Sequence, residues 1–117
     1  MGDEKIFLIE WRAVIELSEQ IYLDPKLEKH WRRIKWKIMH NVAQKEVYLL
    51  LLPLDGQGKL QMMSSLIFLQ KNYPVRDYCI VGMASSKASG YEIITQITSE
   101  IYETYGKIDY NQFFQLA

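Results

Sequence analysis

The chain has 117 residues, which suits one domain and is too short for two. Hydrophobic residues make up 49% of it and charged residues 24%, and this balance excludes disorder over most of the length. The 14 Lys and Arg residues balance the 14 Asp and Glu residues, so no overall basic field exists for nucleic acid, and such binding would need a local patch.

Cysteine content and the start of the chain bear on the compartment. The single cysteine, Cys79, excludes a disulfide within the chain, and the usual spacings of zinc ligands are missing. Residues 1–5 are charged and lack the order of a signal peptide, and the longest apolar run, residues 47–52, is too short for a membrane span. We therefore expect a single domain over residues 1–117 in the cytoplasm, without membrane contact, metal or cofactor.

Hydrophobic periodicity predicts two helices in the first third of the chain. Apolar side chains recur at helical spacing over residues 6–22. A second helix is expected over residues 25–40, with Pro25 in its first turn and Asp24 as its N-cap. The apolar stripe of this second helix consists of Leu27, Trp31, Ile34 and Ile38.

Two continuous apolar runs, residues 46–53 and 77–83, predict strands that are covered on both faces. Residues 60–70 lie between them and are ambiguous. Their apolar side chains do not alternate and cover most of a helical wheel, which favours a buried helix. The rival interpretation is a hairpin in which residues 60–69 pair with residues 46–53.

The last third predicts a helix over residues 90–105 that ends at Gly106, followed by a short turn capped by Asp109. The element order α-α-β-α-β-α then predicts an α/β domain with helices packed on a small two-stranded parallel sheet. The alternative is an α+β fold with the hairpin in a three-stranded sheet. Because two strands leave two exposed edges, we expect two copies to associate as a homodimer.

The loop over residues 82–90 is the first candidate site, because it joins the second strand to the last helix. Such a junction gathers free backbone N–H groups at the positive end of a helix dipole, which suits an anion or phosphate. The residues that would bind the ligand are Gly82, Ser85, Ser86, Lys87, Ser89 and Gly90. P-loop and Rossmann spacings are both missing, and the plainer interpretation is a loop whose Ser89 caps the helix.

The second candidate site is a basic, aromatic face of the helix over residues 25–40. Trp36 falls opposite the apolar stripe, and its neighbours on the wheel are Lys29, Arg32, Arg33 and His40. Such a face can anchor a protein interface, stack nucleic-acid bases, or pack beneath another element. A protein partner or packing is favoured over nucleic acid because the whole chain has no basic excess.

The sequence contains few residues whose type and spacing are typical of a catalytic or metal site. His30 and His40 are ten residues apart, out of helical alignment and without an acidic cluster, so no metal site is expected. Cys79 lies in an apolar strand, where a thiol usually serves packing. The sequence therefore favours a small non-enzymatic, homo-oligomeric protein-interaction module. The alternative is a small-molecule or phosphate-binding protein, with enzymatic activity as an option, that uses residues 82–90.

Overall fold

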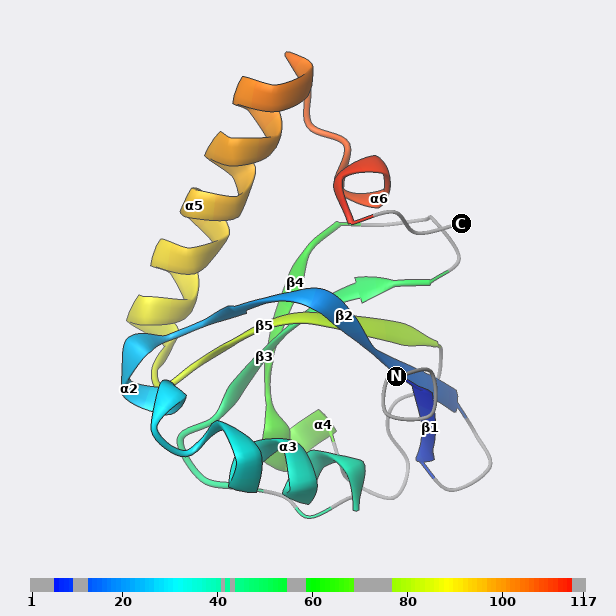
Figure 1. The fold of residues 1–117 in the computed structure, drawn as a ribbon, viewed down its shortest axis with the longest axis vertical. Helices are drawn as coiled ribbons and strands as arrows, with labels where there is room; N and C mark the ends of the chain where they lie inside the picture. The colour runs from blue at the N-terminus through cyan, green and yellow to red at the C-terminus, as the bar shows by residue number, and fades with distance from the viewer. Residues whose placement is uncertain are drawn as a thin grey trace.

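The computed structural model describes residues 6–9, 13–40, 42, 44–54, 59–68 and 77–114, which form a mixed sheet with helices on both faces (Figure 1). The strands are β1 (Ile6–Ile9), β2 (Ala13–Leu23), β3 (Tyr48–Pro53), β4 (Gln61–Ser64) and β5 (Tyr78–Ala84). The helices are α2 (Pro25–Glu28), α3 (Trp31–Met39), α4 (Ser65–Phe68), α5 (Lys87–Tyr105) and α6 (Tyr110–Phe113).

The described strands form a five-stranded sheet in the order β1-β2-β5-β3-β4, so the prediction of a two-stranded parallel sheet is wrong. Strand β5 runs parallel to β2 but antiparallel to β3, so the expected parallel crossover from residues 46–53 to residues 77–83 does not exist. Strand β4 forms an antiparallel pair with β3, as in the rival hairpin interpretation, but within five strands rather than three. The fold is therefore mixed α+β, and the shortage of strands no longer supports self-association.

The helix predicted over residues 6–22 is wrong, because strands β1 and β2 occupy this part of the chain. Leu17 and Ile21 pack on one face of the sheet, whereas Tyr22 packs on the other, as the alternation of a strand requires. A spacing of four residues fits both a helix and an alternating strand, so Leu17 and Ile21 could not separate the two. This segment is a strand because β2 pairs with β1 on one side and with β5 on the other.

The helix predicted over residues 25–40 is confirmed in outline, although a break after Glu28 divides it into α2 and α3. The Asp24 side chain accepts a hydrogen bond from the Lys26 backbone N at 2.9 Å, so the predicted N-cap is confirmed. Of residues 60–70, the described part is strand β4 followed by the single turn α4, so a continuous helix is wrong. Helix α5 begins before residue 90 and is capped by Ser86, so the interpretation of Ser89 as its cap is wrong. Its predicted end at Gly106 and the predicted cap of the last short helix, Asp109, are confirmed.

Two apolar clusters cover the two faces of the sheet. In β3, Leu49 and Leu51 pack in the cluster that contains Ile34 and Ile38 of α3. The alternate positions of β3 pack against α5, in the cluster that contains Leu50, Leu52, Ile93, Ile97 and Ile101. Burial of β3 and β5 on both faces matches the sequence prediction. Because α3 and α5 cover opposite faces, their solvent-facing sides point away from each other (Figure 1).

Candidate functional site

The carboxyl ends of the parallel strands β2 and β5 meet at the junction where the sequence predicts an anion site. Leu23 of β2 lies opposite Met83 of β5, and the next residue, Asp24, donates its backbone N–H to the Met83 carbonyl at 3.0 Å. Parallel pairing thus brings Asp24 beside the first residues of the loop. Its side chain is only 3% exposed.

The Asp24 carboxylate takes the donors that a bound phosphate would need. Oδ2 accepts hydrogen bonds from the Ser85 backbone N at 2.9 Å, from Ser85 Oγ at 2.6 Å and from Ser89 Oγ at 2.7 Å. Burial raises the pKa of Asp24, but the hydrogen bonds from Ser85, Lys26 and Ser89 outweigh it and hold the pKa well below its usual 3.8. Asp24 is therefore an ionised internal anion at neutral pH, and it is too weak a base for acid–base catalysis.

The remaining predicted loop residues serve packing or face solvent. Ser86 Oγ accepts from the Ser89 backbone N at 3.2 Å and caps α5, and Lys87 is exposed. Gly82 is fully inside the sheet, where a Cβ would lie 3.0 Å from the Tyr22 carbonyl. Gly90 packs against Met62, and a Cβ there would collide with the Met62 sulfur. The structure thus brings Ser85 and Ser89 together around an acidic residue that the sequence identified only as a helix cap.

The second candidate surface is the α3 face, which we define as Lys29, Arg32, Arg33, Trp36 and His40. All five side chains are exposed, as expected from the helical wheel, and Trp36 retains 55% of its surface. The Trp36 and His40 rings are stacked, with centroids 4.0 Å apart and planes inclined by 19°. His40 Nδ1 lies 2.7 Å from the Trp36 carbonyl oxygen, which can only accept, so Nδ1 carries a proton and fixes the stack.

The α3 face is the most basic part of a neutral chain. Residues 25–40 hold 6 of the 14 Lys and Arg residues and a single carboxylate, Glu28. Arg33 Nη2 donates to His30 Nδ1 at 3.0 Å, and the guanidinium has no acidic partner among the described residues. Neither Lys29 nor Arg32 pairs with any carboxylate in the part of the chain that the structure describes. An open groove of about 490 Å³ lies beside these cations, lined by residues 28–33.

Catalytic chemistry finds little support in the described residues. No group of three or more His, Cys, Asp or Glu side chains among them could hold a metal ion. Cys79 is fully buried, and burial, reinforced by the charge of Glu16, raises the pKa of its thiol to about 12. Such a thiol is neither nucleophilic nor accessible.

Comparisons with known proteins found no match. No protein-family model, no curated protein and no solved structure matches the chain. Among the described helices, none has the length and apolar character that a membrane span requires.

Proposed function

We propose that this chain is a non-enzymatic protein-interaction module that binds an acidic partner surface through the α3 face. One observation carries the proposal: Trp36 is 55% exposed, although a large apolar ring on a soluble domain is normally covered. Tryptophan and arginine are the residues most enriched at the energetic centres of protein interfaces. The α3 face combines both types on one rigid helix.

The geometry of Trp36 supports a prepared binding site rather than an incidental exposed ring. The hydrogen bond from His40 Nδ1 to the Trp36 backbone carbonyl orients the imidazole, and the indole stacks on that ring before a partner arrives. A side chain that is already ordered loses less conformational entropy on binding. The inner side of the same helix, with Ile34 and Ile38, packs in the core and supports the exposed face.

The charges indicate the chemistry of the partner. Lys29, Arg32 and Arg33 lie on the same face as Trp36 and have no acidic partner in the described part of the chain, so a complementary surface carries carboxylates around an apolar contact. A phosphate site at residues 82–90 has less support, because Asp24 already occupies the donors of Ser85 and Ser89. Nucleic acid remains the less favoured anion, since the residues outside 25–40 hold 8 Lys and Arg against 13 Asp and Glu.

A defined acidic peptide tests the proposal. The probe is a fluorescein-labelled peptide of alternating Glu and Tyr, titrated by fluorescence anisotropy at low salt. We expect Trp36→Ala and the double variant Arg32→Glu/Arg33→Glu to weaken binding by about tenfold or more, as loss of a hot spot does. The matched control is Lys45→Glu/Lys59→Glu, which changes the net charge equally at two exposed lysines outside the α3 face and should bind normally.

Three outcomes would overturn the proposal. The first is the absence of peptide binding by the wild-type chain. The second is equal weakening by the control pair, which would mean that only net charge matters. The third is displacement of the peptide by a single-stranded oligonucleotide at lower concentration than by unlabelled peptide, which would favour nucleic acid. Circular dichroism of each variant confirms that it is folded.

A further inference from the structure

We infer that the acidic surface bound by the α3 face is the outer face of α5 on a second copy of this chain. The inference rests on the proposed function and names the partner for the same site. It would join copies head to tail, since each copy offers one basic and one acidic helix.

The outer side of α5 repeats an aromatic–acidic pair. We define the α5 face as Tyr91, Glu92, Tyr102 and Glu103, all of which are exposed, with both tyrosines at 61%. The two Tyr-Glu pairs are eleven residues apart, which corresponds to about three helical turns and about 16 Å along the axis. Both pairs therefore lie on the same side of the helix, and no described element covers them.

The α5 face carries the negative charge of its helix. Helix α5 contains three glutamates and one lysine, Lys87, at its first position. Glu100 is already engaged, because it accepts hydrogen bonds from the Tyr22 hydroxyl at 2.5 Å and from Gln96 Nε2 at 3.1 Å. The side-chain carboxylates of Glu92 and Glu103 have no hydrogen bond or ion pair with any other residue that the structure describes, so their charges are available to a partner.

The two faces are complementary in chemistry. Cations surround an exposed indole on the α3 face, whereas carboxylates flank exposed phenol rings on the α5 face. Arginine and aromatic rings attract one another through cation–π contacts, and pairs of aromatic rings add to this attraction. The chain as a whole is neutral, so its own acidic residues supply the charge that residues 25–40 require.

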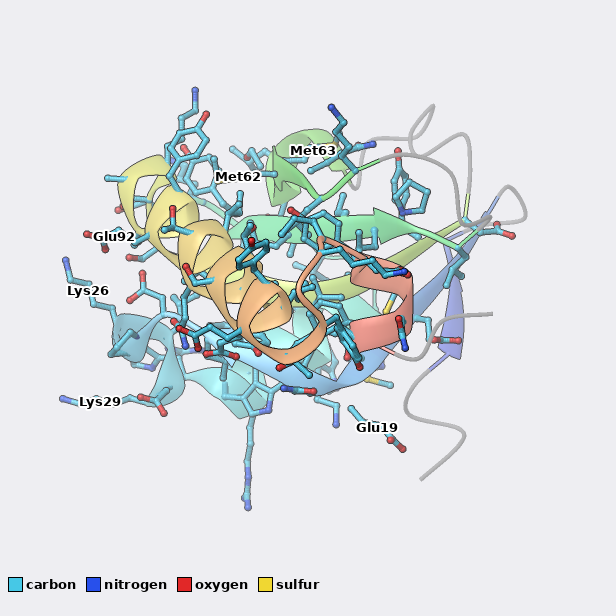
Figure 2. The ribbon with its side chains drawn as sticks, turned by 90° about the horizontal axis from the view of Figure 1, so that it is seen from above. Glu19, Lys26, Lys29, Met62, Met63 and Glu92 are labelled. Carbon is cyan, nitrogen blue, oxygen red and sulfur yellow. The ribbon has the colours of Figure 1, made fainter. Side chains whose placement is uncertain are left out.

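The position of the faces makes the contact intermolecular. Helices α3 and α5 pack on opposite faces of the sheet, and among the described residues no hydrogen bond joins the α3 face to the α5 face of the same molecule. Figure 2 shows Lys29 extending from the α2–α3 segment and Glu92 extending from α5, both outward toward the left side of the view. A contact between different surfaces of identical molecules is heterologous, and it extends into open chains unless it closes into a ring.

Sedimentation velocity with exchanged charges tests this inference. In low salt, we expect the wild-type chain to show a mass that rises with concentration above the monomer mass of 13.9 kDa. In about 1 M salt we expect the monomer alone, because charges are screened over about 3 Å at that ionic strength. Arg32→Glu/Arg33→Glu makes both faces acidic, and Glu92→Lys/Glu103→Lys makes both faces basic. Each double variant should therefore remain monomeric at concentrations where the wild-type chain associates.

The decisive protein carries all four substitutions in one chain. Its net charge equals that of the wild type, its basic and acidic faces are exchanged, and it should associate like the wild type. A wild-type chain that is monomeric at low salt, association of Glu92→Lys/Glu103→Lys, or a monomeric fourfold variant would each overturn the inference. The acidic peptide separates the two proposals, because Glu92→Lys/Glu103→Lys keeps the α3 face. If that variant binds the peptide but the wild type does not self-associate, the proposed function stands and the inference fails.

Discussion

Replacing Asp24 with alanine removes a buried carboxylate that holds the ends of β2, β5 and the start of α5 together. The Ser85 backbone N–H then loses its acceptor, and an unsatisfied polar group of this kind costs about 1–3 kcal/mol. Loss of the N-cap bond to the Lys26 backbone N adds about 1 kcal/mol. We therefore expect Asp24→Ala to lower the free energy of unfolding by about 3 kcal/mol, a large part of the roughly 5–15 kcal/mol typical of a domain.

The assay is urea unfolding followed by circular dichroism, and Asp109→Ala is the matched control. Asp109 is also the N-cap of a helix, but among the described residues its side chain accepts one hydrogen bond, from the Gln112 backbone N at 3.1 Å. Its loss should cost only about 1 kcal/mol. If Asp24→Ala is no more destabilising than Asp109→Ala, then the bonds from Ser85 and Ser89 add no stability and the reasoning is refuted.

The same variant predicts a dependence on acid. The folded-state pKa of Asp24 is depressed by its hydrogen bonds, so its contribution to stability is present above the unfolded-state pKa of 3.8 and is lost as the pH falls below that value. The difference in unfolding free energy between wild type and Asp24→Ala should thus be constant near neutral pH and shrink once the pH drops below about 4. A difference that stays constant into strong acid would contradict the assigned ionisation.

Two further experiments, one with substitutions and one with a thiol reagent, probe the packing around α5 and β5. Gly90→Ala should gain more of the about 1 kcal/mol of helix propensity in a Met62→Ala background than in the wild type, because the Met62 side chain must move to admit the new Cβ. Additive effects in urea unfolding of the four proteins would contradict this contact. Ellman's reagent should modify Cys79 no faster than the chain unfolds, since the thiol is fully buried with a pKa raised to about 12, and rapid labelling of the folded protein would disagree.

The parts of the fold that the sequence predicted correctly are those with an unambiguous local signal. Strands β3 and β5 are continuous apolar runs, and α5 shows a clear helical stripe with Gly106 at its end in the left-handed conformation (φ 73°). Strand β2 was missed because Leu17 and Ile21 fit both periodicities. Its pairing with β5 joins positions such as Ile15 and Tyr78, which are far apart in the sequence, and no local pattern contains that information.

The two candidate sites also differ in whether a local sequence pattern is enough to predict them. The α3 face depends only on positions along one helix, so the wheel of residues 25–40 already grouped Trp36 with its cations. The cluster at Asp24 depends on the parallel register of β2 and β5, which a mistaken helix over residues 6–22 concealed. A loop rich in serine beside a helix start suggested an incoming anion. Without the register, the sequence could not show that the chain supplies that anion itself.

Segregation of charge in a neutral chain follows from the layered fold. Both α3 and α5 bury an apolar stripe against the sheet, so only their outer faces are free to carry charge. A pair of exposed charges gains only about 1 kcal/mol at 4 Å in water, and less in salt, so Lys29, Arg32 and Arg33 alone give little affinity. In the proposed complex, these cations attract and orient the partner, whereas burial of Trp36 supplies the larger share of the affinity. Both properties are needed together, and among the described helices α3 alone presents an exposed tryptophan among unpaired cations.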